Sequence, residues 1–158
     1  MLQPHVRWMI RRDLPEVLAI EAASFEFAWS EEDFLRALRQ RNCIGMVAEI
    51  NGDAVIGYMV YELHKYAIAI TNMAVEPHFR RRGVGRAMVT KLKSKLSSHR
   101  RTSIDVLVRE TNLAGQLFLR DCGFRAELVL PNHYEADTDE AAYKFTHRIP
   151  VESAVMLD

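Results

Sequence analysis

Residues 75–87 read Val75-Glu76-Pro77-His78-Phe79-Arg80-Arg81-Arg82-Gly83-Val84-Gly85-Arg86-Ala87. In this stretch a strand ends, Pro77 and its neighbours form a turn, and a helix begins near Gly83. The first turn of a helix has unpaired N–H groups and a partial positive charge. Glycines at that point let a phosphate approach the backbone closely, and the arginines add positive charge. The stretch therefore predicts an anion site at a strand-to-helix connection.

The glycine spacing narrows the kind of anion site. Gly83-x-Gly85 matches neither G-x-G-x-x-G nor G-x-x-x-x-G-K-[ST], so a dinucleotide-binding fold and a P-loop NTPase are both disfavoured. A basic turn that caps an ordinary helix stays open as the alternative at this point.

The pattern around this stretch predicts strands interrupted by helices. Asn51-Gly52 is a strong hairpin signal between two apolar segments. Asp13, with Pro15 and Glu16 after it, and Ser30 are expected to cap the first two helices. We expect strands at 6–10, 46–50, 54–63, 67–75, 102–108, 124–130 and 142–149, and later helices over about 83–98 and from 111 or 112 to 123. This order is typical of an α+β or mixed-sheet fold.

Length and composition indicate one globular domain. The chain has 158 residues, of which 49% are hydrophobic and 27% charged. We expect a single domain over 1–150, followed by a frayed tail at 151–158. Lys+Arg and Asp+Glu are both 21, a balance that disfavours nucleic acid as a partner and makes any anion site local.

The N-terminal segment and the cysteines predict a cytoplasmic location. Arg7 and Arg11 interrupt the N-terminal apolar residues, so we expect neither a signal peptide nor a membrane span. Cys43 and Cys122 are far apart and lack C-x-x-C spacing, as expected of free thiols in a reducing cytosol. The histidines show no metal-ligand spacing, and we expect no metal site.

Arg80, Gly83 and Gly85 fill the three fixed positions of the signature (Gln or Arg)-x-x-Gly-x-(Gly or Ala). The loop thereby resembles the pyrophosphate loop of the GCN5-related N-acetyltransferase (GNAT) superfamily. The resemblance extends from about residue 6 to residue 149, and further stretches are similar to the bacterial ribosomal-protein-alanine N-acetyltransferases. These are residues 20–30 with their Phe-x-Trp-Ser ending, 72–77, 108–112 with 122–124, and 132–134.

The resemblance implies the acyl-CoA N-acyltransferase fold, which has a mixed, mostly antiparallel central sheet flanked by helices. It also implies acetyl-CoA as cosubstrate and, as acceptor, the α-amine at a protein or peptide N-terminus, such as that of a ribosomal protein. The backbone of Met73, Ala74 and Val75 would pair with the pantetheine arm like an added strand. The other implied cofactor contacts are Asn112 and the loop of Arg80, Arg81, Arg82, Gly83, Val84, Gly85 and Arg86, whose backbone N–H groups from Arg81 onward would hold the pyrophosphate.

Two catalytic side chains of the resembling branch are absent here. That branch has a Glu as base on its fifth strand and a Tyr as acid on the next helix, and alignment places Leu107 and Leu119 at those positions. An α-amine, with a pKa of about 7.8, costs roughly 1 kcal/mol to deprotonate at pH 7, against roughly 4.6 kcal/mol for a lysine at about 10.4. An α-amine acceptor therefore tolerates the loss of a base far better than a lysine does.

Replacement groups have to come from elsewhere in the chain. Tyr134 is the candidate acid because it follows a strand end and Pro131-Asn132. Glu26, in the first loop, and Glu110, beside the missing base, are the candidate bases. The alternatives are a packing role for Tyr134 and a solvated surface position for each glutamate. The nearby aromatic residues Phe25, Phe27 and Trp29 either pack in the core or line the acceptor groove.

Three functions stay open on the sequence alone. The first is an N-terminal acetyltransferase, and the second is an acetyltransferase of the same fold that acts on a small amine or a lysine. The third is a catalytically weak acyl-CoA-binding module that regulates a partner, which the two leucines support. The acceptor, the acyl-chain length and the choice between monomer and homodimer are not determined.

Overall fold

The structure of the 158-residue chain is a computed structural model that describes residues 2–52, 54–134 and 140–150. Its strands are β1 (His5–Trp8), β2 (Cys43–Ile50), β3 (Ala54–Leu63), β4 (Ala67–Val75), β5 (Ser103–Arg109), β6 (Arg125–Leu130) and β7 (Ala142–Arg148). Its helices are α1 (Leu14–Ser24), α2 (Glu31–Leu38), α3 (Val84–Lys93) and α4 (Leu113–Asp121). The strand order is β1-β2-β3-β4-β5-β7-β6, and β1/β2, β2/β3, β5/β7 and β6/β7 pair antiparallel. The α+β fold with a mostly antiparallel sheet is thus confirmed.

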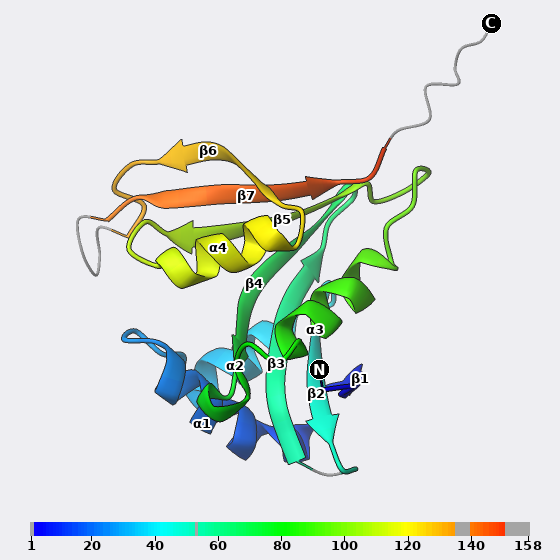
Figure 1. The fold of residues 1–158 in the computed structure, drawn as a ribbon, viewed down its shortest axis with the longest axis vertical. Helices are drawn as coiled ribbons and strands as arrows, with labels where there is room; N and C mark the ends of the chain where they lie inside the picture. Colours follow the sequence, from blue (N-terminus) through cyan, green and yellow to red (C-terminus); the bar gives the residue numbers. More distant parts are fainter. Residues whose placement is uncertain (1, 53, 135–139, 151–158) are drawn as a thin grey trace, which may run out of the picture. The chain divides into compact units, whose positions relative to one another are not determined.

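Contacts divide the chain into two compact units, each of which is described by itself. The first unit runs to Leu63 and resumes over Ile70–Leu92, and the second contains His64–Ala69 and the chain from Lys93 onward. Figure 1 shows the elements of both units in sequence colours. The single domain over 1–150 stays a prediction, and the tail expected at 151–158 lies outside the described residues.

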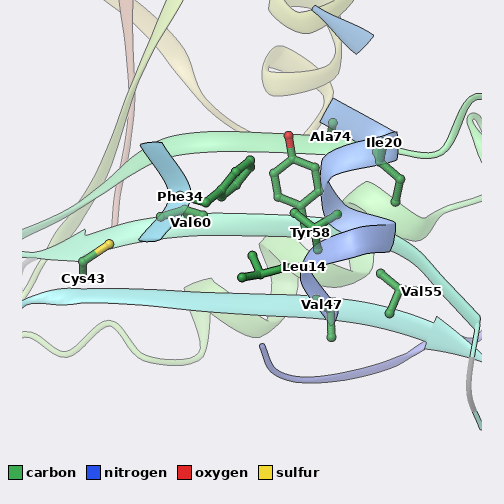
Figure 2. Close-up of a cluster of buried hydrophobic side chains, with 10 residues drawn as sticks. Leu14, Ile20, Phe34, Cys43, Val47, Val55, Tyr58, Val60 and Ala74 are labelled. Carbon is green, nitrogen blue, oxygen red and sulfur yellow. The ribbon is translucent and has the colours of Figure 1, made fainter. Parts of the chain in front are cut away.

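In the first unit, helices cover both faces of the strands. An apolar cluster lies between α1, α2 and the strands, and Figure 2 shows the ring of Phe34 beside that of Tyr58 within it. On the opposite face, a Cβ built on Gly57 would lie 3.0 Å from a carbon of Met88 and 3.2 Å from one of Val84. Because neighbouring residues of a strand point to opposite faces, Tyr58 faces α1 and α2 whereas Gly57 makes room for α3.

The hairpin between β2 and β3 turns where the sequence predicts it. Asn51 has φ 54° and Gly52 has φ 85°, left-handed conformations that asparagine and glycine tolerate better than other residues, and Ile50 pairs with Ala54 across the turn. β2 begins three residues earlier than expected, because Cys43 already pairs with Glu62 of β3. The turn therefore helps to set the register between β2 and β3.

The two predicted helix caps have different outcomes. Ser30 and Asp33 form a capping box, with the Asp33 N–H donating to Ser30 Oγ at 3.2 Å. Asp13 precedes α1 as expected, but the prediction that its side chain caps the helix is wrong. Its carboxylate instead accepts two bonds from the Arg7 guanidinium, at 2.8 and 2.9 Å, and one from the Ile10 N–H. The bonds from Arg7 lower the pKa of the Asp13 carboxyl.

The helix α3 is shorter than the predicted span to residue 98. It ends at Lys93, where the chain leaves the helix through a bond from the Leu96 N–H to the Lys93 carbonyl at 3.1 Å. A second turn follows, closed by the Ser97 N–H on the Arg101 carbonyl at 2.8 Å. These i,i+3 and longer-range bonds satisfy backbone groups that a continued helix would have paired.

In the second unit, β7 lies between β5 and β6, with Phe145 opposite both Val106 and Ala126. Asn112 caps α4 as predicted, because its Oδ1 accepts a bond from the Gly115 N–H at 2.9 Å. From α4, Gln116 Nε2 donates to the carbonyl of Arg109, the last residue of β5, at 3.2 Å. At the edge, β6 has a bulge between Ala126 and Leu128.

Replacement of Phe34 by alanine tests the core of the first unit. The Phe34 side chain is fully buried and meets Trp29 edge-on at 5.0 Å and Tyr58 at 5.7 Å between ring centroids. We expect Phe34→Ala to lower the free energy of unfolding by about 3–5 kcal/mol in urea denaturation. Leu35→Ala, which removes a half-buried neighbour on the same helix, is the control and should cost less. A loss below about 1 kcal/mol for Phe34→Ala would contradict this packing.

Candidate functional site

The last residues of β4 are the segment expected to face the pantetheine arm. Ala74 is buried, while Met73 and Val75 are half-buried. The Met73 N–H donates to the Oδ1 of the preceding Asn72 at 3.0 Å, and the Val75 carbonyl accepts from Arg80 Nε at 3.0 Å. Side chains thus hold both ends of the segment in place.

Arg80 ties the basic loop to the rest of the first unit. Besides its bond to the Val75 carbonyl, its guanidinium donates from Nη2 to the Ser24 hydroxyl at 2.9 Å. The side chain therefore joins β4, the loop and the last turn of α1. The sequence indicated a positive charge and a signature position at Arg80, and the structure shows that its side chain also bonds the loop to Val75 and Ser24.

The backbone of the loop adopts an uncommon conformation. Arg81 has φ 62° and Gly83 has φ 87°, both in the left-handed region, which costs a non-glycine residue such as Arg81 about 1–2 kcal/mol. The helical ladder of α3 begins with the Ala87 N–H on the Gly83 carbonyl at 2.9 Å, so the amides of Val84 and Gly85 precede it. Amides in such turns at a helix N-terminus form a concave set of donors suited to an anion.

The remaining arginines of the loop region lie at the surface. Arg81, Arg82 and Arg86 are exposed, and the Arg82 guanidinium lies 5.6 Å from the centre of the Phe79 ring. The local positive charge expected from the sequence is thus present in a chain whose formal net charge is zero.

In the second unit, Tyr134 packs against a partly buried ion pair. The Arg109 guanidinium lies 3.9 Å from the centre of the Tyr134 ring and donates to Glu140 Oε1 at 3.1 Å. Glu140 is buried and also accepts bonds from the N–H and the hydroxyl of Thr111. Burial raises the pKa of the Tyr134 phenol, against the opposing effect of the Arg109 charge. The phenol is therefore a proton donor at neutral pH.

Glu110 and Asn112 follow Arg109 closely in the sequence. Glu110 is exposed, and its carboxylate accepts from the Ala141 N–H at 3.2 Å while its own N–H donates to the Ala141 carbonyl at 3.0 Å. Tyr134 is joined to the neighbouring residue, because its N–H donates to the Glu140 carbonyl at 3.2 Å. The segment at 140–141 is thus bonded to both Glu110 and Tyr134, whereas Asn112 is exposed as the cap of α4.

The two leucines at the family's catalytic positions differ in burial. Leu119 on α4 is only 4% exposed, so a packing side chain occupies the position of the family's tyrosine. Leu107 on β5 is 40% exposed and lies opposite Lys144 of β7. Glu26, the candidate base in the first unit, is exposed in the turn after α1.

A buried carboxylate in the first unit was missed by the sequence analysis. Glu21 of α1 is 1% exposed and accepts from the Trp29 N–H at 2.9 Å, from Asn72 Nδ2 at 2.8 Å and from the Tyr58 hydroxyl. Burial and the bond to Glu21 raise the pKa of Tyr58, which keeps the phenol protonated. An acidic residue within the apolar stripe of α1 was the one available signal.

The sequence profile of the Acetyltransferase (GNAT) family matches residues 14–124, and the chain belongs to this family. It is accordingly an acetyl-CoA-dependent N-acetyltransferase, and the resemblance noted from the sequence is confirmed. The match covers α1 to the end of α4, including the Arg80–Gly85 loop.

Named relatives and solved structures agree with this membership. The chain is 27% identical over 123 residues to the ribosomal protein bS18-alanine N-acetyltransferase of Salmonella typhimurium, covering 77% of this chain and 81% of the relative. The crystal structure of the ribosomal-protein-S18-alanine N-acetyltransferase from Escherichia coli is similar with a TM-score of 0.84 and 22% identity, over 99% of this chain and 100% of that one. Ard1 from Thermoplasma volcanium is similar with a TM-score of 0.83 and 25% identity, over 94% and 99% of the two chains.

Within residues 2–52, 54–134 and 140–150, no cluster of three or more His, Cys, Asp or Glu side chains is arranged to hold a metal ion. In the same part of the chain, no helix has both the length and the apolar character needed to cross a bilayer.

The protonation of Tyr134 can be measured directly. Because burial raises its pKa, the phenol should stay protonated through neutral pH and ionise only above pH 10. We expect the ¹³Cζ tyrosine NMR signal that disappears in Tyr134→Phe to titrate with a midpoint above pH 10. A midpoint below pH 10 would show that the Arg109 charge outweighs burial.

Proposed function

We propose that this acetyltransferase acetylates the N-terminal α-amine of a protein, with a ribosomal protein as the candidate acceptor. The main support for the proposal is the name of a relative. The protein that matches 77% of this chain is called the ribosomal protein bS18-alanine N-acetyltransferase. The chemistry of the site supports it, since an α-amine needs little help to lose its proton and Leu107 replaces the family's base.

The reaction follows direct attack in a ternary complex. The neutral amine nitrogen bonds to the acetyl carbonyl carbon, the carbon–sulfur bond breaks, and the CoA thiolate leaves. Tyr134 supplies a proton to the thiolate, and Glu26 or Glu110 receives the proton that the amine loses. Holding the two reactants in alignment lowers the free-energy barrier by several kcal/mol, and by about 7–11 kcal/mol at most.

The cofactor contacts in this proposal come largely from backbone. Backbone groups of the 73–75 segment pair with the pantetheine arm, and N–H groups from Arg81 to Arg86 hold the pyrophosphate. Asn112 contributes through its Nδ2, because its Oδ1 already accepts from the Gly115 N–H. Arg80 acts by holding the loop against Val75 and Ser24. A cytoplasmic location also stays a prediction.

A glutamate at Gly83 tests the pyrophosphate loop. Gly83→Glu places a side chain and a negative charge where the phosphates would lie, and we expect acetyl-CoA binding to be lost in calorimetric titration. Gly52→Glu is a matched control, since Gly52 has nearly the same φ (85° against 87°) and nothing within 4 Å of an added Cβ. Both variants carry the same backbone strain and charge, so equal acetyl-CoA affinity in the two would reject the loop assignment.

The acceptor is tested by CoA release with a panel of short peptides. Each peptide is offered with a free and with a blocked N-terminus, beside small amines and peptides whose one free amine is a lysine. We expect turnover only with free N-termini, with alanine-starting peptides among the substrates. Turnover on lysines or small amines that equals or exceeds turnover on free N-termini would overturn the proposal.

A further inference from the structure

The last turn of α1 carries two polar side chains that reach other parts of the first unit. Glu21 and Ser24 are three residues apart, a spacing that places them on one side of the helix. Glu21 is buried and its carboxylate accepts three hydrogen bonds. Burial of a carboxylate costs free energy unless hydrogen bonds compensate for the lost water. The three donors to Glu21 are therefore held in position.

One of these donors leads to the start of the proposed cofactor segment. Asn72 Nδ2 donates to Glu21 at 2.8 Å, which fixes the orientation of the carboxamide. The Oδ1 of the same carboxamide then accepts from the Met73 N–H at 3.0 Å. Glu21 therefore sets, through Asn72, the position of the first amide of the 73–75 segment.

Ser24 reaches the other end of that segment. Its hydroxyl accepts from Arg80 Nη2 at 2.9 Å, and Arg80 Nε donates to the Val75 carbonyl at 3.0 Å. One helical turn thus holds the 73–75 segment at both ends, each time through one intermediate side chain.

The same carboxylate also holds the first loop, which connects α1 to α2. The Trp29 N–H donates to Glu21 Oε2 at 2.9 Å. The Trp29 ring packs edge-on against Phe34, which in turn packs on Tyr58, the third donor to Glu21. Both the loop and the cofactor segment are therefore bonded to a single side chain.

We propose that Glu21 is a positioning residue that couples acetyl-CoA binding on the 73–75 segment to the order of the first loop. The proposal rests on the function proposed above, in which that segment pairs with pantetheine, and it assigns to the first loop the acceptor-groove role that the sequence left open for its aromatic residues. Acetyl-CoA restrains Asn72 and, through the carboxylate, Trp29, so that the acceptor meets a more ordered loop. By linkage, a bound acceptor tightens acetyl-CoA binding by the same factor.

The coupling can be followed through the fluorescence of Trp29. The chain has two tryptophans, and Trp8 is 72% exposed on β1, so Trp8→Phe leaves Trp29 as the reporter. In this background, acetyl-CoA should cause a saturable change in Trp29 emission. Glu21→Gln should reduce the amplitude at saturation at least five-fold, because a carboxamide cannot accept from all three donors and presents its own NH₂ to one of them.

Glu16→Gln is the matched control on the same helix. Its carboxylate accepts from the Val55 N–H at 3.1 Å, so it joins α1 to the sheet away from the 73–75 segment and the first loop. The substitution removes the same charge, and the Trp29 response should persist. Asn72→Ala interrupts the proposed route without touching the carboxylate, and it should lose the response as Glu21→Gln does. It serves as the second test if Glu21→Gln does not fold.

Steady-state kinetics on the peptide identified by the panel add a second readout. Glu21→Gln should raise the peptide KM at least five-fold at saturating acetyl-CoA, with a smaller change in kcat. A Trp29 response that is equal in the Glu21→Gln, Asn72→Ala and Glu16→Gln variants, or absent from the Trp8→Phe parent, would overturn the coupling. The fluorescence test needs acetyl-CoA alone, so a failed peptide panel with an intact response rejects the proposed acceptor and not the coupling.

Discussion

Inside the first unit, the buried carboxylate of Glu21 accepts hydrogen bonds from the residue that precedes the proposed cofactor segment and from the first loop. Removing the acceptor from a buried donor costs about 1–3 kcal/mol, and Glu21 serves three donors at once. Helix, loop and two strands therefore have to be arranged together for the carboxylate to be satisfied. The relative positions of Trp29, Tyr58 and Asn72 follow from this single requirement.

Turns and helix caps could be predicted from the sequence, because they depend on residues that are neighbours in the chain. Asn51-Gly52 supplies the two left-handed residues of the turn, and Ser30 with Asp33 supplies both halves of a capping box. The turn that leads from Arg80 into α3 was predicted for the same reason, because such turns depend on the residues within them, whereas its role in binding phosphate stays a prediction.

Contacts between residues far apart in the chain could not be predicted from local sequence patterns. Tyr58 and Asn72 lie 37 and 51 positions from Glu21, so no spacing rule connects them. Asp13 illustrates the same limit: its position before α1 predicted a cap, but Arg7 on β1 binds the carboxylate more strongly than a helix amide would. The packing of Arg109 on Tyr134 was likewise visible only after folding.

The strands at the two ends of the strand order have a consequence for the behaviour of the protein at high concentration. β1 is only four residues long, and β6 is interrupted by its bulge and carries Glu127, which is paired with Arg148 at 2.7 Å. Short, bulged or charged outer strands are poor templates for the backbone of another molecule. Each of these outer strands therefore disfavours the open-ended strand addition that begins many aggregates.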